Sequence, residues 1–252
     1  MTEDQTEGAS EPTKSSGGLV KVIVPILLLI GIAGGWFVSS SMQTKAELAA
    51  NDELKALGAF PQLDVGRKFV STLMIREKID DAMPHVAKLR KLNTFDAERS
   101  DFGDEHVESI LGNKGLNSLT LSQTKITDAG VAKLKSMGVK DLYLSQTPIT
   151  AAALDSVVQM PALEILDVSH TPVATNLAKL KEAQGLVWLR MDGVDISSME
   201  AEAVEILLAL PKLGRLTFSP STGFSEASVD RLKNERPQLF IDKVEDLPAD
   251  EQ

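Results

Sequence analysis

Residues 116–127 read LNSLTLSQTKIT, and close copies follow as VKDLYLSQTPIT at 139–150 and LEILDVSHTPVA at 163–174. In each copy the first, fourth and sixth places are apolar, at a spacing that does not change from one copy to the next. Consecutive copies of this kind indicate a chain that is built by stacking similar units. We therefore predict a repeat architecture for the greater part of the chain.

The same pattern extends on both sides of these three copies. Copies begin at Leu92, Leu116, Val139, Leu163, Leu186 and Leu213, so that successive starts are 24, 23, 24, 23 and 27 residues apart. Apolar fourth and sixth places with an outward residue between them predict a short strand that buries one face. The second part of several copies has a helical pattern, as in TDAGVAKLKSM at 127–137. Another helix is predicted in SSMEAEAVEILLAL at 197–210, where Ser197 and Glu200 predict a capping box.

One strand and one helix at this period resemble the leucine-rich repeat, whose pattern is L-x-x-L-x-L-x-x-N/C-x-L. The T-x-I-T-D-x-G wording of residues 124–130 is similar to the short repeats of bacterial, membrane-anchored leucine-rich repeat proteins. The resemblance covers about residues 92–220. It implies an α/β solenoid, which is an arc with a parallel sheet on its concave face and helices on its convex face.

One place departs from the family pattern, because threonine stands where the family has asparagine. These threonines are Thr124, Thr147 and Thr171. We expect their hydroxyl groups to bond the backbone of the adjacent turn, although more weakly than an asparagine amide would. Val194 holds the same place in the fifth copy and cannot form such a bond. We therefore expect the fourth and fifth copies to be the least regular part of the stack.

The N-terminal part of the chain differs from the repeats in composition. Residues 1–18 are polar and carry almost no large apolar side chain, so we expect them to be disordered. Residues 19–41 contain an uncharged apolar run, from Val22 to Val38, that predicts a single transmembrane helix. Lys21 and Trp36 stand near its two ends, where an ammonium group and an indole ring suit the membrane interface.

A cleaved signal peptide is the alternative for this segment, since small residues stand at 38–40. We favour a retained anchor because the segment before the run is long and mostly acidic rather than basic. Lys14 and Lys21 precede the run, and Lys45 and Lys55 follow it, so the positive-inside rule leaves the orientation open. We take the repeats to lie outside the cytoplasmic membrane as a working hypothesis.

Three further segments are predicted around the repeats. Residues 42–61 are predicted to form a helical stalk that begins with a capping box at 44–47, although the same pattern suits the first helix of the folded domain. Residues 62–91 are predicted to be a helical N-terminal cap, which a stack needs to cover the apolar face of its first unit. The repeats with a C-terminal cap then occupy residues 92–242, and residues 243–252 form an acidic tail that we expect to be disordered.

The concave face would display the residues at the third, fifth and seventh places of each copy. Aromatic and charged residues at these places predict a protein-binding surface, formed by Asp96, Glu98, Asp141, Tyr143, Asp167, Trp188, Arg190, Asp192 and Arg215. Trp188 is either an anchor for a partner or a side chain that packs on Ile165 of the neighbouring strand and stiffens the sheet. The carboxylates are either a binding patch or a solvated face.

Composition and motifs narrow the function classes. A net charge of -10 disfavours nucleic-acid binding, and the absence of cysteine excludes disulfides, thiolate metal sites and a cysteine nucleophile. The sequence has no phosphate-binding glycine loop, HExxH or GxSxG, so we expect neither an enzyme nor a cofactor. The predicted function is a membrane-anchored module that binds a protein or a peptide. The alternatives are a self-assembling scaffold and a secreted repeat protein, and the sequence does not fix the partner or the oligomeric state.

Overall fold

The computed structural model describes residues 45–248 of the chain. The predicted disordered tail at 1–18 and the predicted membrane span at 19–41 lie outside the described residues. Within 45–248, no helix combines the length and the apolar composition that crossing a membrane requires.

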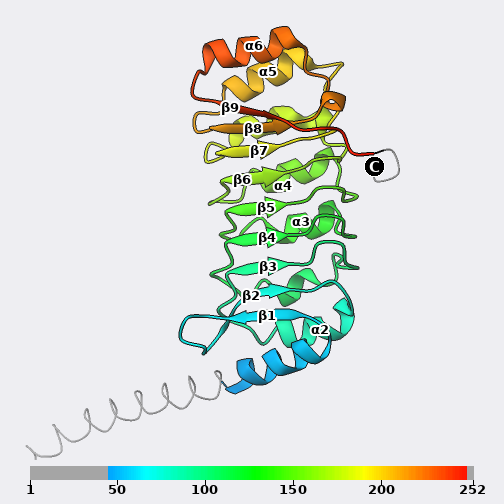
Figure 1. Cartoon of the computed structure of the whole chain (residues 1–252), viewed down its shortest axis with the longest axis vertical. Helices are drawn as coiled ribbons and strands as arrows, with labels where there is room; N and C mark the ends of the chain where they lie inside the picture. The colour runs from blue at the N-terminus through cyan, green and yellow to red at the C-terminus, as the bar shows by residue number, and fades with distance from the viewer. Residues whose placement is uncertain (1–44, 249–252) are drawn as a thin grey trace, which may run out of the picture. The chain divides into compact units, whose positions relative to one another are not determined.

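The described residues form one sheet with helices packed behind it (Figure 1). After a helix at 45–56, the strands are β1 (Phe60–Leu63), β2 (Val70–Met74), β3 (Thr94–Asp96), β4 (Ser118–Thr120), β5 (Asp141–Tyr143), β6 (Ile165–Asp167), β7 (Trp188–Arg190), β8 (Arg215–Phe218) and β9 (Phe240–Lys243). The α-helices are α2 (Ile79–Val86), α3 (Asp128–Leu134), α4 (Leu154–Val157), α5 (Glu200–Leu208) and α6 (Glu226–Glu235). Short 3₁₀ segments are η1 (Val107–Ser109), η2 (Ala151–Ala153), η3 (Ala174–Glu182) and η4 (Pro220–Thr222).

The strands pair in chain order, and this order follows from the repeat. Strand β1 is antiparallel to β2, and every later pair of neighbours from β2 to β9 is parallel. The fourth place of each copy lies opposite the fourth place of the next, as Leu119, Leu142 and Leu166 show. Each strand from β3 to β7 covers the third to fifth places, one residue earlier than the alternation predicted.

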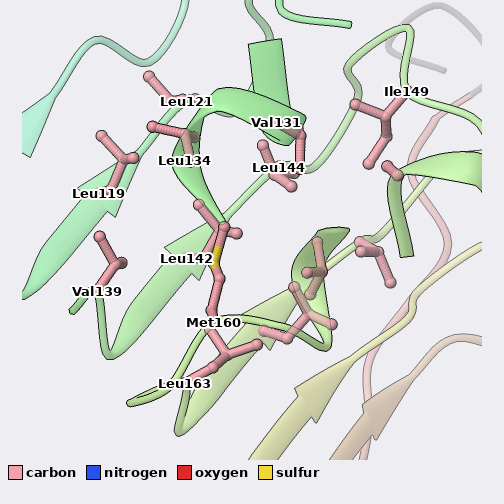
Figure 2. Close-up of a cluster of buried hydrophobic side chains, with 14 of the residues drawn as sticks. Leu119, Leu121, Val131, Leu134, Val139, Leu142, Leu144, Ile149, Met160 and Leu163 are labelled. Atoms are coloured by element: carbon pink, nitrogen blue, oxygen red, sulfur yellow. The ribbon is translucent and has the colours of Figure 1, made fainter. Parts of the chain in front are cut away.

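The predicted apolar places form one continuous core. The first, fourth and sixth places of all six copies are at most 5% exposed, from Leu92 to Phe218. Figure 2 shows how Leu119, Leu142 and Leu144 point from their strands toward helix residues such as Leu134. Stacking therefore buries a column of side chains that a single copy could not cover by itself. The predicted solenoid architecture is confirmed for the described residues.

The predicted helical cap at 62–91 is wrong in one part, because it contains a further strand of the stack. Strand β2 pairs in parallel with β3, with Leu73 opposite Phe95. Its apolar residues Val70, Leu73 and Ile75 have the same spacing as the first, fourth and sixth places of a copy, and all three are buried. A β-hairpin of β1 and β2, with helix α2, therefore begins the stack.

The helix at 45–56 belongs to the folded domain and is not a free stalk. Ala50 and Leu54 on one side of it are buried in the same core as the repeats. Apolar residues four places apart lie on one face of a helix, and here that face packs on the end of the stack. The alternative interpretation, a first helix of the domain, is the one that the structure supports.

The threonines at the asparagine place bond within their own turn, and not to the adjacent turn as predicted. Thr124 Oγ1 donates to Leu121 O at 2.6 Å, and Thr147 Oγ1 donates to Leu144 O at 2.6 Å. A hydroxyl has one hydrogen to donate, so it satisfies the carbonyl at the sixth place of its own copy.

The fifth copy, where Val194 lacks a hydroxyl, receives one from the next copy. Thr222 Oγ1 donates to Met191 O at 3.1 Å, which is the carbonyl at the sixth place, and accepts from Gly193 N at 3.1 Å. Thr222 is fully buried. The expected irregularity at Val194 is therefore compensated by Thr222.

We expect Thr222→Val to lower the free energy of unfolding by about 1–2 kcal/mol, because a buried hydroxyl with two backbone partners is lost. Adding Val194→Thr to this variant should restore part of the loss, since that hydroxyl would reach Met191 O as Thr124 reaches Leu121 O. Urea unfolding followed by circular dichroism measures both effects. An unchanged unfolding midpoint in the single variant would show that Thr222 is not a structural replacement.

The Thr-Asp-x-Gly motif at residues 127–130 links neighbouring copies on the helical side of the stack. The carboxylate of Asp104 accepts from Thr127 N at 2.8 Å and Thr127 Oγ1 at 2.5 Å, and Asp128 accepts in the same way from Thr150. A Cβ at Gly130 would lie 2.2 Å from Asp104 Oδ1 and 2.6 Å from Ile126 Cγ1, so a larger residue there would require these side chains to shift. The motif is therefore explained by packing.

The predicted capping box at Ser197 is wrong. Helix α5 begins at Glu200, and its N-cap residue, Met199, makes no side-chain capping bond. The Glu200 carboxylate instead accepts from Ser225 N at 2.6 Å, one copy further along the stack. A contact between copies has replaced the local contact that the sequence suggested.

Candidate interaction surface on the parallel sheet

The third, fifth and seventh places of the copies lie on the side of the sheet opposite the core, and we call this side the sheet face. In-register pairing aligns each place into a row that crosses the strands. The fifth-place row contains Tyr143, Asp167 and Arg190, on three neighbouring strands. Neighbouring parallel strands lie about 4.8 Å apart, so side chains within a row are in reach of one another.

A pocket of about 580 Å³ lies on the sheet face, and we call it the sheet pocket. Its lining residues are Asp96, Glu98, Thr120, Ser122, Gln123, Tyr143, Ser145, Gln146, Asp167, Ser169, His170, Arg190, Asp192, Val244, Glu245 and Leu247. The predicted residues Asp141, Trp188 and Arg215 are not part of this lining. The other predicted residues of the binding surface are brought together in it.

One end of the sheet pocket is closed by an ion pair from strand β2. Arg76 holds both carboxylate oxygens of Asp96 at 2.8 Å, and its Nη2 is 3.8 Å from Glu98 Oε2. The bond to Asp96 raises the pKa of Arg76. Arg76 was missed in the sequence because β2 was not recognised, although it holds the seventh place of that strand's pattern. Asp96 is therefore paired within the chain, whereas Glu98 has only the longer contact to Arg76 and is 37% exposed.

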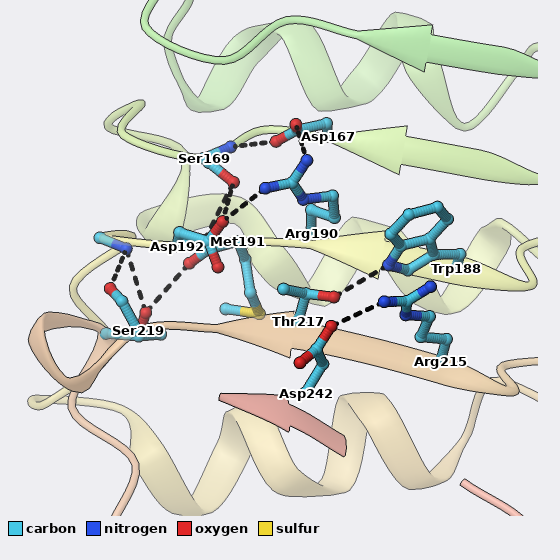
Figure 3. Close-up of polar contacts among 12 residues, drawn as sticks. Asp167, Ser169, Trp188, Arg190, Met191, Asp192, Arg215, Thr217, Ser219 and Asp242 are labelled. Atoms are coloured by element: carbon cyan, nitrogen blue, oxygen red, sulfur yellow. Dashed lines mark hydrogen bonds and ion pairs between the residues drawn. The ribbon is translucent and has the colours of Figure 1, made fainter. Parts of the chain in front are cut away.

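The other end of the sheet pocket is formed by Arg190 and two buried carboxylates (Figure 3). Arg190 Nη1 is 3.5 Å from Asp167 Oδ2, and Arg190 Nη2 donates to Asp192 Oδ2 at 3.1 Å. Ser169 joins the two carboxylates, because its N donates to Asp167 at 2.9 Å and its Oγ donates to Asp192 at 3.2 Å. Burial raises the pKa of Asp167, while Ser169 and Arg190 act in the opposite direction.

Trp188 lies beside this cluster and is packed toward strand β8. Its Nε1 donates to Thr217 Oγ1 at 3.0 Å, and the guanidinium carbon of Arg215 lies 4.2 Å from the centre of its ring (Figure 3). Arg215 also lies 5.5 Å from the ring centre of Phe240 and donates to Asp242 at 2.6 Å. We call Trp188, Arg215 and Phe240 the aromatic row. Trp188 thus stiffens the sheet through β8, while Phe240 at the end of the row is 60% exposed.

The two remaining predicted residues on strand β5 are half-buried. Burial, with the charge of Glu164, raises the pKa of Asp141. Burial, with the charges of Asp141 and Asp167, raises the pKa of the Tyr143 hydroxyl, so the phenol remains protonated at neutral pH. Tyr143 can therefore donate or accept a hydrogen bond in the middle of the sheet pocket.

The rim of the sheet pocket repeats an unusual backbone conformation. Gln123, Gln146 and His170 follow the seventh places of three successive copies, and each has a positive φ of 52–56°. Side chains in this left-handed region cost about 1–2 kcal/mol per residue. Gln123 Nε2 donates to Gln146 Oε1, which ties two of these turns together. The repeat alignment contains these positions, but no sequence signal distinguishes their backbone.

The segment that follows β9 also lines the sheet pocket, and the sequence did not predict this. Val244 N donates to Phe218 O at 3.0 Å, and Asp246 accepts from Ser221 N at 3.0 Å. The predicted acidic tail is therefore packed on the fold as far as residue 248, and the part at 249–252 lies outside the described residues. Within 45–248, no group of three or more acidic or histidine side chains is placed to hold a metal ion.

Comparisons with known proteins add two distant likenesses. No model of a known protein family matches the sequence, and no curated protein sequence does. The fold is similar to an internalin from Listeria monocytogenes at 15% identity and a TM-score of 0.48, over 78% of this chain and 63% of that one, so the chain spans less than two thirds of its length. It is also similar to actin-binding site 2 of leiomodin-1, at 15% identity and a TM-score of 0.25, over 64% of this chain and 73% of that one.

The assignment of the fold therefore depends on features of the chain itself. Its repeat has a period of 23–24 residues over most copies, and its apolar ladder at the first, fourth and sixth places is buried. From β2 to β9 its strands are parallel and in register, and helices pack on one side of the sheet (Figure 1). By these features the described residues have the fold of a leucine-rich repeat solenoid.

Proposed function

We propose that this protein is a membrane-anchored interaction module that binds a protein or a peptide on its sheet face and catalyses no reaction. The aromatic row is the observation that carries the proposal. Aromatic and arginine side chains are the residues that dominate binding energy in protein interfaces, and here they are stacked on one another. Phe240 leaves most of its surface open to solvent beside that stack.

The charged residues of the sheet pocket support binding rather than catalysis. A general acid or base needs a proton that can move between the side chain and a substrate. Asp96 is instead held by Arg76 through two bonds, and Asp192 and Asp167 share Arg190. These pairs fix the side chains in place, which suits a preformed binding surface.

We expect Trp188→Ala to reduce the capture of a partner by about tenfold or more, because truncating a tryptophan at the centre of an interface removes a large contact area. A photo-crosslinking amino acid at Ser145, on the sheet face, measures this capture in cells. The same amino acid at Lys135, an exposed residue at the end of α3, is the matched control on the helical side.

Two checks separate binding from folding in this experiment. Trp188→Phe keeps a ring under Arg215 but loses the bond to Thr217, so it should retain most of the capture. The thermal midpoint of each variant shows whether the fold is intact. Adducts that form only from position 135, or a Ser145 adduct that Trp188→Ala leaves unchanged, would refute the sheet face as the binding surface.

The membrane anchor is a separate part of the proposal, supported by the uncharged run in residues 19–41. Because the chain has no cysteine, Ser145→Cys gives a single thiol in the repeats. We expect a membrane-impermeant maleimide to label the full-length, membrane-bound protein once only an outer barrier is opened. Labelling that requires lysis of the inner compartment would place the repeats in the cytoplasm, and a shortened soluble product would indicate a cleaved signal peptide.

A further inference from the structure

The lining of the sheet pocket is unbalanced in charge. Its carboxylates are Asp96, Glu98, Asp167, Asp192 and Glu245, and its lining includes a single arginine, Arg190. Arg76 reaches Asp96 and Glu98 from β2 without itself lining the pocket. Counting Arg76, the carboxylates still exceed the cations, so the pocket favours a positively charged guest.

The positions of the chain's own arginines leave the middle of the sheet pocket open. Arg76 lies at the β2 end and Arg190 at the β7 end, with strands β3, β4, β5 and β6 between them. On β4 and β5 the floor consists of short hydroxyl side chains, such as Ser122 and Ser145, with Tyr143. These side chains can bond a guest but do not fill the space, and the carboxylates of Glu98 and Glu245 line the same pocket.

A buried acceptor within this lining has no donor. Asp192 is 5% exposed, and its Oδ2 is bonded to Ser169 and Arg190. Its Oδ1 has no hydrogen-bond partner in the part of the chain that the structure describes. A buried carboxylate oxygen without a donor is unfavourable, so a cationic group that brings N–H donors into the pocket would be stabilised there.

The surface next to the sheet pocket is aromatic. Trp188 is two residues before Arg190 on β7, and the aromatic row continues from it to Phe240 at the edge strand β9. In an extended peptide every second side chain points to the same face, about 6.6 Å from the last, so one segment can reach both the pocket and the row. The surface thus combines a site for a cation with a site for an apolar side chain.

We propose that the sheet pocket takes a lysine or arginine side chain of an extended peptide segment. An apolar side chain on the same face of that segment, two residues away, lies on the aromatic row. This inference rests on the proposed function and specifies the chemistry of the partner. The raised pKa of Asp167 is consistent with it, because a bound cation would stabilise the ionised form of that buried carboxyl.

A selection with random linear peptides displayed on phage tests the inference on the full-length protein in detergent micelles. We expect the selected peptides to be enriched in lysine or arginine with an apolar residue two places away, on the same face of an extended segment. Replacing that basic residue by glutamine in a synthetic copy of a selected peptide should weaken binding by about tenfold, as loss of a charged contact in a partly buried site does.

Variants of the protein locate the cation. Glu98→Gln combined with Glu245→Gln removes two carboxylates from the pocket lining and should weaken binding of the basic peptide by about tenfold. Glu202→Gln removes an exposed carboxylate from α5, on the helical side of the sheet, and should leave binding unchanged. The glutamine form of the peptide should not distinguish these variants.

Each outcome decides between the two proposals. Basic peptides whose binding falls with the pocket variants but not with Glu202→Gln support the inference. Peptides without basic residues, whose binding falls in Trp188→Ala alone, would overturn it while leaving the proposed function in place. If no peptide is selected, the inference is overturned. If peptides are selected but neither the pocket variants nor Trp188→Ala change their binding, both the inference and the sheet face as the binding surface are overturned.

Discussion

Arg236→Met is expected to lower the free energy of unfolding by about 3–5 kcal/mol, because each buried carbonyl that loses its donor costs about 1–3 kcal/mol. Arg236 ends helix α6 and is 8% exposed. Its guanidinium donates to four backbone carbonyls, those of Leu207, Leu210, Pro211 and Leu213. These carbonyls belong to the end of α5 and the turn that leads into β8.

The physical reason for this large effect is that the last carbonyls of a helix have no partner within the helix. A cation at a helix C-terminus is also favoured by the helix dipole. Methionine fills much of the same volume but offers no donor, so the carbonyls of Pro211 and Leu213 would lose the donor that Arg236 supplies. The carbonyls of Leu207 and Leu210 would keep their bonds from Leu210 N and Leu213 N. Arg236→Lys keeps the charge but loses the planar guanidinium group. Its free energy of unfolding should therefore lie between those of the unchanged protein and Arg236→Met.

Arg231→Met is the matched control, on the same helix. Arg231 bonds Glu205 and Glu235 at 2.7 Å on the surface, where such pairs contribute little. Urea unfolding monitored by circular dichroism compares the two variants. Similar unfolding midpoints for Arg231→Met and Arg236→Met would contradict the structural role that the buried carbonyl contacts indicate.

The sequence predicted the stack because the solenoid is specified by a local pattern that recurs. Each copy must bury its first, fourth and sixth places against the next, so the spacing that identifies Leu119 and Leu142 is also the spacing that packs them. The strand β2 was missed for a related reason. Phe69, Leu73, Ile79 and Met83 suit a helix by spacing, and only Val70, Leu73 and Ile75 taken together match the repeat. A short apolar run can fit either the 3.6-residue period of a helix or the two-residue period of a strand.

The candidate site was predictable in position but not in its pairings. Alternation places Asp167 and Arg190 on one face, and register then places them opposite each other. Nothing in the alternation says that Arg190 also bonds Asp192, since that depends on side-chain rotamers. The lining by Glu245 was missed because an acidic C-terminal segment is ordinarily solvated, whereas here backbone bonds such as Val244 N to Phe218 O continue the sheet.

Phe102→Ala is the other change with a large expected effect, a loss of about 3–5 kcal/mol in the free energy of unfolding. Phe102 holds the eleventh place of the first copy, where later copies carry the smaller Ile126, Ile149 and Ile196. It is fully buried, and its ring centre lies 5.7 Å from that of Phe95 and 5.4 Å from that of His106. Truncation would therefore leave a cavity between the first repeat strand and the loop behind it.

The comparison with Phe102→Ile tests whether the cavity or the aromatic contact matters. Isoleucine is the residue that three of the other copies use, so it should fill part of the space and cost less than alanine does. Because each copy of a solenoid contacts only its neighbours, the loss should also be local. Hydrogen exchange should increase most in β2, β3 and β4, and least in β8. Equal increases in all strands would show that the stack unfolds as one unit, and a loss below about 1 kcal/mol in Phe102→Ala would show that the site collapses around the smaller side chain.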